Sequence, residues 1–338
     1  MKIHILYKTK SSPYGGGNQF LKALRNEFIK MKVYSCNVRE TDVILFNSHH
    51  FLEDAMRYKS SDKLFVHRID GPVFDVRGGD RTTDKIIFRF NSLFSDGTVF
   101  QSQWSREKCY IRGLQKMKYE TVIMNAPDSD IFNSKGKFSF ERNRKIKLIS
   151  TSWSSNWRKG FDIYRFLDEN LDFSKYEMTF LGESPVGFKN IKHIKPLPSE
   201  GVADILKKND IFIIASENDP CSNSLIEALH CGLPAVARNS GGHPRIIGKS
   251  GELFNGSEDI ISSINRVVSN YEKYQRSIDL PTIGEIARRY YGFAKMIYDE
   301  KENKQYQPKK ITIQKKTQFL GLKLGVKFRR LGAKIIRL

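Results

Sequence analysis

The sequence predicts an α/β protein with two Rossmann-like domains, and three observations lead to that prediction. The chain has 338 residues, which exceeds one average domain and suits two domains of about 150 residues each. With 39% hydrophobic and 28% charged residues, it can build buried cores. Short apolar runs alternate with helix-compatible stretches of about ten to fifteen residues, a pattern typical of parallel sheets flanked by helices.

The apolar runs of the first half indicate strands at residues 3–7, 43–47, 63–67 and 98–101, and a helix over 18–31. The second half repeats the alternation, with strands from residue 146 and at 178–181, 211–215 and 235–238, and helices over 160–170, 202–208, 224–230 and 260–274. A polar stretch at 133–143 separates the halves. We therefore expect domains at 1–138 and 144–282, with ligands bound outside the carboxyl ends of the strands.

The net charge of +20 has a local source in residues 309–338, which hold ten Lys or Arg and no Asp or Glu. Apolar residues are interleaved with these cations, so residues 303–338 are expected to form a basic amphipathic tail that suits an anionic membrane surface. A solvated or partner-bound tail is the alternative. Nucleic acid is not expected as a partner, because the chain has no zinc-finger spacing, RNP-type motif or recognition helix.

The compartment expected from the sequence is the cytoplasm, with a possible peripheral position on the cytosolic membrane face. The first ten residues do not read as a signal peptide, and no apolar run approaches the ~20 residues that cross a bilayer. The four cysteines form no CxxC pair and have no His partner at zinc spacing, so we expect buried, reduced thiols.

The most informative segment runs from residue 215 to 251 and reads as a strand, a polar loop, a helix and a glycine-rich turn. Ser222, Asn223 and Ser224 precede the helix, whose free N–H groups and dipole can bind an anion. Glu227, one turn in, could accept hydrogen bonds from ribose hydroxyls, and Asp219 could hold sugar hydroxyls. Alternatively, Asp219 caps a helix and Glu227 is a solvated helix residue.

This segment resembles the E-x7-E region of GT-B glycosyltransferases of family 4, with Asp219 in place of the first Glu. The resemblance implies that Glu227 binds the donor ribose, that Ser222 to Ser224 lie by the diphosphate, and that Asp219 contacts the donor sugar. Arg245 stands near the position where the family often has a Glu.

A second motif, at 150–162, also resembles the family. Lys159-Gly160 matches the family's phosphate-binding Lys-Gly, whereas Ser154 occupies the position of its Arg. A preorganised cation would stabilise the charge that develops on a departing nucleoside diphosphate. Arg158 could replace the missing charge, or Lys159 could act with backbone donors alone; an exposed Arg-Lys pair can also be merely solvated.

Two motifs of the first half also resemble the family, and they imply donor-binding roles for Gly16 and Gly17, a catalytic role for His67 and an acceptor-side role for Asp70. Gly16 and Gly17, in PYGGGNQF, fit its Gly-Gly loop and would let backbone approach a phosphate or sugar; a flexible turn is the alternative. His67, in FVHRIDGP, matches a histidine near the reacting sugar, although a strand-end His is often structural. Asp70 could contact the acceptor, orient His67 or Arg68, or begin a turn.

The resemblance covers about residues 1–300 and implies a GT-B fold, with two domains facing a central cleft and a helix at 283–302 that crosses back to the first domain. It also implies a retaining glycosyltransferase that uses a nucleotide-sugar, UDP more than GDP, and a glycan or lipid-linked acceptor. His67, Lys159 and Asp219 would carry the chemistry without a metal or cofactor, and Asp128-Ser129-Asp130 is interpreted as a turn. An inactive sugar-binding module and a nucleotide-sugar epimerase are the alternatives.

Overall fold

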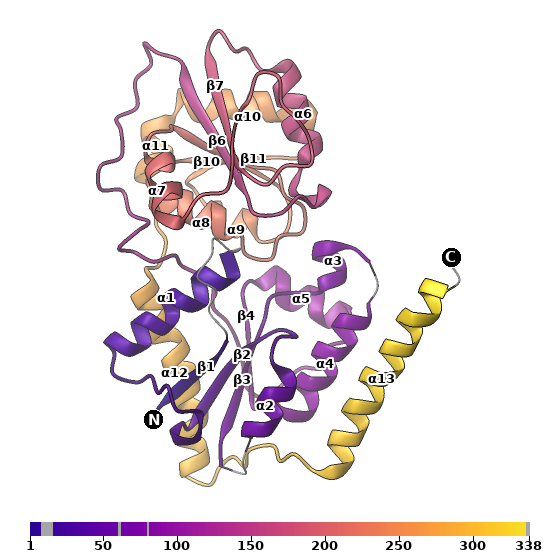
Figure 1. Ribbon diagram of the computed structural model, residues 1–338. Helices are drawn as coiled ribbons and strands as arrows, with labels where there is room; N and C mark the ends of the chain where they lie inside the picture. Colours follow the sequence, from indigo (N-terminus) through magenta and orange to yellow (C-terminus); the bar gives the residue numbers. More distant parts are fainter. Residues whose placement is uncertain (8–15, 60–61, 80, 336–338) are drawn as a thin grey trace. The chain divides into compact units, whose positions relative to one another are not determined.

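The computed structural model describes residues 1–7, 16–59, 62–79 and 81–335, and divides the chain into two compact units. Unit 1 comprises Met1–Lys8, Arg25–Ile123 and Ala287–Leu338, and unit 2 comprises Thr9–Leu24 and Met124–Ile286. Each unit is an α/β structure with a parallel sheet and flanking helices (Figure 1). This confirms the predicted fold class.

The sheet of unit 1 has five parallel strands in the spatial order β1-β2-β3-β4-β5. The strands are β1 (Ile3–Leu6), β2 (Val43–Asn47), β3 (Leu64–Ile69), β4 (Gly97–Phe100) and β5 (Glu120–Val122). The helices are α2 (Leu52–Tyr58), α3 (Val73–Arg77), α4 (Thr82–Phe94), α5 (Gln103–Ile111) and α13 (Ile313–Ile335), with a 3-10 turn at Val38–Glu40. Two further helices are divided between the units: α1 (Gly16–Lys30) enters unit 1 at Arg25, and α12 (Ile283–Glu302) enters it at Ala287. Strands β2 and β3 are buried along their whole length, as near-continuous apolar runs predict.

The C-terminal segment is part of the core of unit 1. Phe319 of α13 is fully buried against Phe90 and Phe94 of α4, with ring centroids 5.2 and 6.0 Å apart. Within α12, Ile297 packs so closely on β4 that a Cβ on Gly97 would lie 2.6 Å from its Cδ1 atom. The expected tail at 303–338 is therefore anchored to the first unit rather than free of it.

The sheet of unit 2 has six parallel strands in the order β11-β10-β9-β6-β7-β8. The strands are β6 (Ile146–Ser152), β7 (Tyr176–Gly182), β8 (Lys192–Ile194), β9 (Ile211–Ile214), β10 (Ala235–Arg238) and β11 (Gly251–Phe254). The helices are α6 (Phe161–Asn170), α7 (Ser199–Lys207), α8 (Asn223–His230), α9 (His243–Ile247), α10 (Ser257–Ser269) and α11 (Tyr271–Arg276), with a 3-10 turn at Trp157–Lys159. The strand order reverses between β6 and β9, and ligands of open α/β sheets bind at the carboxyl ends of strands at such a switch point.

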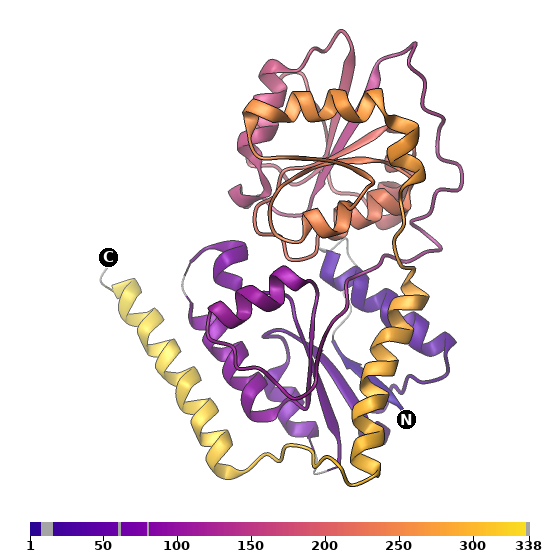
Figure 2. The same cartoon turned by 180° about the vertical axis from the view of Figure 1, so that it is seen from behind.

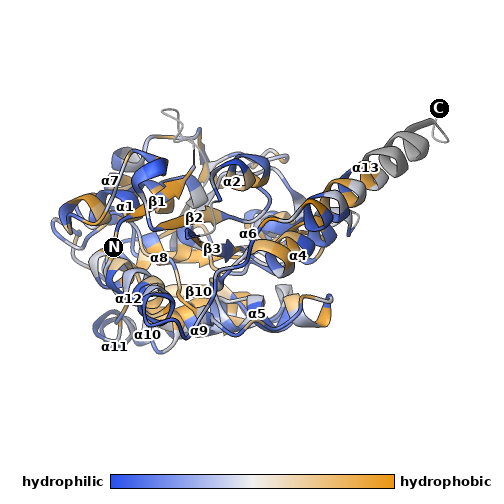
Figure 3. Cartoon of the chain, turned by 90° about the horizontal axis from the view of Figure 1, so that it is seen from below, coloured by the Kyte–Doolittle hydropathy of each residue, from blue (hydrophilic) through white to orange (hydrophobic). Residues whose placement is uncertain are grey.

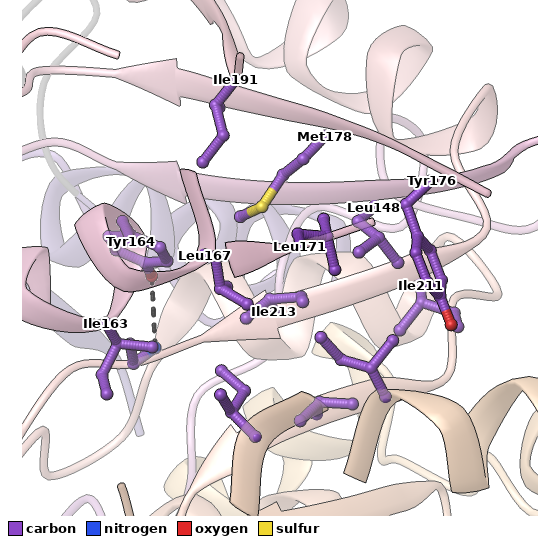
Figure 4. Packing of buried hydrophobic residues seen from close by; sticks show 14 of the residues in the cluster. Leu148, Ile163, Tyr164, Leu167, Leu171, Tyr176, Met178, Ile191, Ile211 and Ile213 are labelled. Atoms are coloured by element: carbon purple, nitrogen blue, oxygen red, sulfur yellow. Dashed lines mark hydrogen bonds between the residues drawn. The ribbon is translucent and has the colours of Figure 1, made fainter. Parts of the chain in front are cut away.

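Apolar side chains cover both faces of this sheet. On one face, Leu148, Leu167, Met178 and Ile213 belong to a cluster that also includes α10 (Figure 4). The second face packs against α7 and α8. Helix α10 covers the first face and runs across the sheet in the rear view (Figure 2). Because both faces of the sheet are buried, the positions of its strands, and of the polar loops that follow them, are fixed.

The structure departs from the sequence prediction in particular places. Residues 9–24 and 124–138 belong to unit 2, in whose core Phe132 is buried, so unit 1 does not coincide with the expected range 1–138. The predicted helix 260–274 is interrupted at Asn270, between α10 and α11. Strands β5, β8 and β11 were not predicted, because they are short and only partly buried. Cys36 is an exposed thiol, whereas the other three cysteines are buried as expected.

Candidate active site

Three loops meet at the carboxyl ends of β6, β9 and β10 in unit 2. The Glu217 N–H donates to the Arg158 carbonyl at 2.8 Å, and the Gly242 N–H donates to the Asp219 carbonyl at 2.8 Å. Gly160 and Gly241 have φ of 86° and 63°, and a Cβ on either would overlap backbone of Ala215 or Asp219. Glycine is therefore required at both positions for the loops to approach each other.

Lys159 and Asp219 form an ion pair at this edge. The Lys159 Nζ lies 3.0 Å from Asp219 Oδ2, and the Cys221 N–H donates to Asp219 Oδ1 at 3.2 Å. Burial alone would raise the pKa of Asp219, but the Lys159 ammonium and the His243 ring lower it below its ordinary value. The Lys159 side chain remains 34% exposed, so its cation can meet a ligand from solvent.

His243 is a buried member of this cluster that the sequence analysis missed. Its Nδ1–H donates to the Arg238 carbonyl at 3.0 Å, and its Nε2 lies 3.3 Å from Ser216 Oγ. Burial lowers the pKa of His243, although the nearby Asp219 raises it. A single histidine after a Gly-Gly turn gives no sequence signal for this position, because the contact depends on how the loops fold.

Glu227 is the second acidic residue of the predicted donor motif and lies in α8. It is only 6% exposed, and within the described part of the chain no group donates a hydrogen bond to its carboxylate. Burial raises the pKa of Glu227 to about 8. A buried carboxylate without donors is unfavourable, so this position suits a ligand that brings hydroxyl groups.

The three residues predicted to lie by the diphosphate are at the start of α8. Ser222 is the N-cap, and its Oγ accepts from the Leu225 N–H at 3.4 Å and lies 3.1 Å from Ser224 Oγ. The Asn223 Oδ1 accepts from Asn125 Nδ2 at 3.0 Å. The predicted residues therefore lie together at the N-terminus of α8, where they also stabilise the helix.

The basic residues near Lys159 are more numerous than the motif suggested. Arg158 is half-buried in the turn that carries Lys159, and Arg238 at the end of β10 pairs with Glu217 at 2.9 Å. Ser154, which stands where the family has Arg, accepts a hydrogen bond from the Asn156 N–H through its Oγ at 3.2 Å. Its role here is to shape the loop.

A separate polar cluster lies at the carboxyl ends of β2, β3 and β4 in unit 1. The Asp70 carboxylate accepts from Asn47 Nδ2 at 3.0 Å and also from Arg68 and Gln101. Burial alone would raise the pKa of Asp70, but the Arg68 guanidinium and the Asn47 amide lower it. The Asp70 side chain is 41% exposed whereas Arg68 is buried, so Asp70 is the accessible residue of the pair.

His67 does not have the exposure that its predicted contact with a sugar requires. It is fully buried, its Nε2–H donates to the Ser48 carbonyl at 2.8 Å, and its Nδ1 accepts from Asn91 Nδ2 at 3.2 Å. Burial lowers the pKa of His67 to about 4. Both ring nitrogens are thus occupied inside unit 1, and the histidines that follow β2, His49 and His50, are the exposed ones.

Two other predicted features can be placed only in part. Gly16 begins α1, and a Cβ on Gly17 would meet nothing within 4 Å, while residues 13–15 of the same motif lie outside the described residues. Asp128 accepts from the Asp130 N–H at 3.0 Å, the geometry of a turn. Across the described ranges, no three His, Cys, Asp or Glu side chains gather where they could hold a metal ion, and no helix is long and apolar enough to cross a membrane.

Comparison with known proteins gives partial matches in sequence. An uncharacterized protein of Sulfolobus islandicus rod-shaped virus 1 is 25% identical over 47% of this chain and 50% of its own length. A probable sucrose-phosphate synthase of Thermosipho melanesiensis is 31% identical over 29% of this chain and 23% of its own length. The chain thus spans half or less of the curated relatives that it matches.

Solved structures match a larger part of this chain than the sequence relatives do. Anabaena HepE, solved in complex with UDP-glucose, has a TM-score of 0.64 and 14% identity, over 90% of this chain and all of that one. The two units thus have the arrangement of strands and helices of GT-B glycosyltransferase structures. Residues 187–279, which include Asp219 and Glu227, match the family model Glycosyl transferases group 1. Residues 187–279 therefore resemble a Glycosyl transferases group 1 domain, and the chain has a GT-B fold.

Proposed function

We propose that this chain is a retaining, metal-independent glycosyltransferase. It would move a sugar from a nucleotide-sugar, UDP-linked more readily than GDP-linked, to a glycan or lipid-linked saccharide. One observation carries the proposal: the Lys159–Asp219 pair lies at the switch point between β6 and β9, next to the start of α8. The family match over residues 187–279 supports the same assignment.

The donor is expected to bind along α8 and the neighbouring loops. Two ribose hydroxyls would donate to Glu227, which lacks a donor among the described residues. The diphosphate would lie by Ser222, Asn223 and Ser224 at the positive end of the helix dipole. Lys159, with Arg158 in the same turn, would supply the cationic charge.

The reaction breaks the bond between the anomeric carbon and the diphosphate oxygen. The acceptor hydroxyl oxygen forms the new bond from the same face, and its proton passes to the departing phosphate oxygen. Lys159 and the helix N–H groups stabilise the charge that this oxygen gains. Asp219, held by Lys159 and Cys221, would then orient sugar hydroxyls rather than act as a nucleophile.

The acceptor would bind unit 1, where Asp70 is the candidate contact because its side chain is partly exposed. His67 would act through its neighbours, as a positioning residue for the β3 end, since its ring is buried. Gly16 and Gly17, at the start of α1 in the part that belongs to unit 2, would allow close approach of backbone to the donor.

A nucleotide-sugar screen by thermal shift, in the presence of EDTA, tests the donor assignment. A ligand that binds only the folded state raises the melting temperature according to its concentration over its Kd. We expect a shift with one nucleotide family, followed by transfer to a saccharide acceptor in a product assay. No shift with any nucleotide would contradict the proposal. Binding without turnover would favour an inactive binding module, which the Ser154 loop also permits, and product without acceptor would favour an epimerase.

A further inference from the structure

Helix α13 has two apolar sides, and only one of them is covered by the protein. Phe319 and Val326 are buried on the side that packs against α4. The helix is also held by a hydrogen bond from Arg89 Nη2 to Gln318 Oε1 at 2.8 Å and by an ion pair between Lys323 and Glu53 of α2. These contacts fix which side of α13 meets solvent.

The solvent side of the helix carries Ile313, Leu320 and Leu324, which are 87%, 36% and 55% exposed. Their spacing of seven and four residues places them in one stripe along the helix, because successive residues turn by ~100°. The described part of α13 accordingly mixes hydrophobic and hydrophilic residues along its length (Figure 3). Among the described helices, no other one exposes more than one large apolar side chain.

The charge of the same segment identifies what could cover this stripe. Residues 309–338 contain ten Lys or Arg and no acidic residue; two of them are held within unit 1, because Lys309 donates to the Ser92 carbonyl and Lys323 pairs with Glu53. We propose that the exposed stripe of α13 binds the surface of an anionic membrane, with Ile313, Leu320 and Leu324 inserted at the headgroup level and exposed cations such as Lys310 and Lys316 on lipid phosphates.

Other binding partners would match either the positive charge or the apolar stripe of this surface, but not both. Nucleic acid would neutralise the cations but leave the three apolar side chains in water. A second copy of the helix would bury the apolar stripe but bring two strongly positive segments together. An anionic bilayer meets both requirements, so the observations favour it.

Vesicle flotation of the full chain tests the proposal. We expect binding to phosphatidylcholine vesicles that contain phosphatidylglycerol, little binding to phosphatidylcholine alone, and weaker binding as salt is raised. Replacing Ile313, Leu320 and Leu324 together by Ser should lower the vesicle partition coefficient by at least about tenfold, because apolar insertion is lost. Truncation is a poorer test, since it would remove the buried Phe319.

The matched control replaces Ile29, Ile111 and Met296 by Ser, three exposed apolar side chains of unit 1 on three other helices. This control should float like the wild type, and both triple variants should keep the wild-type melting temperature and nucleotide response. The melting temperature and the nucleotide response thus distinguish failure of the membrane proposal from failure of the proposed donor site. Absence of flotation with anionic vesicles, or equal flotation of the stripe variant, would overturn the proposal; salt-dependent binding to a DNA duplex instead would identify nucleic acid as the occupant.

Discussion

The Nζ atom of Lys159 lies 3.0 Å from the Oδ2 atom of Asp219, although the two residues are 60 positions apart in sequence. Their loops follow β6 and β9, which are neighbours in the sheet although five elements separate them along the chain. The pair places a cation and a carboxylate side by side at the carboxyl ends of these two strands.

Replacing Lys159 by Met should reduce transfer by about 10²–10³-fold, because a preorganised charge for the leaving diphosphate is lost. Lys159→Arg should retain part of the activity. The double variant Lys159→Met/Asp219→Asn should recover the stability lost by leaving Asp219 unpaired, without recovering transfer. The measurements are initial rates and denaturant midpoints, with Lys189→Met as a control at an exposed position of the same unit. Wild-type rates in Lys159→Met would remove this residue from the mechanism.

Glu227→Gln should abolish the nucleotide-induced thermal shift while leaving the free protein at least as stable as the wild type near pH 8. The amide removes a buried charge that no described group satisfies, but it cannot accept two hydroxyl donors in the same way. The control Glu200→Gln makes the same change at an exposed position of α7. A retained shift in Glu227→Gln would show that the ribose binds elsewhere.

Nucleotide binding should release close to one proton at pH 7. The folded-state pKa of Glu227, about 8, lies above its ordinary value of 4.5, so the free protein holds the proton in this window and its stability falls as pH rises from 4.5 to about 8. Ribose hydroxyls favour the carboxylate, so affinity should increase with pH up to about 8. Calorimetry in buffers of different ionisation enthalpy measures the release, which should vanish in Glu227→Gln. Proton uptake on binding would contradict this mechanism.

Gly160→Ala and Gly241→Ala should each destabilise unit 2 by about 1–3 kcal/mol and weaken nucleotide binding. Both residues have positive φ, and a Cβ would overlap the backbone of a neighbouring loop. Gly292→Ala, in α12, meets nothing within 4 Å and should stabilise the chain by up to about 1 kcal/mol. Urea denaturation compares the three variants. Neutral effects at Gly160 and Gly241 would mean that the loops do not pack this closely.

His67→Phe should lower the free energy of unfolding by about 1–3 kcal/mol, because Ser48 and Asn91 lose their partner. The folded-state pKa of His67, about 4, lies below its ordinary value of 6.5. Its contribution to stability is therefore lost as pH falls from 6.5 through 4, and the variant should lack this acid sensitivity. Urea midpoints between pH 4 and 7 measure it. A variant with wild-type stability but no transfer would restore the catalytic role that the sequence suggested.

Part of the fold could be read from local pattern. The runs at Val43–Asn47 and Ala235–Arg238 predicted two strands with their observed bounds, because buried parallel strands are continuously apolar. The loop before α8 and the spacing of Asp219 and Glu227 likewise placed the donor motif on a strand, loop and helix.

The sequence by itself determined the alternation of strands and helices and the residue types at the strand ends, since these depend on neighbours within a few positions. Only the tertiary structure decided that Lys159 meets Asp219, that His243 lies buried beside them, and that His67 is enclosed. It also decided that Phe319 is covered while Leu324 is exposed on the same helix. The physical reason is that strand order and helix docking are set by packing between distant segments, which periodicity along the chain does not encode.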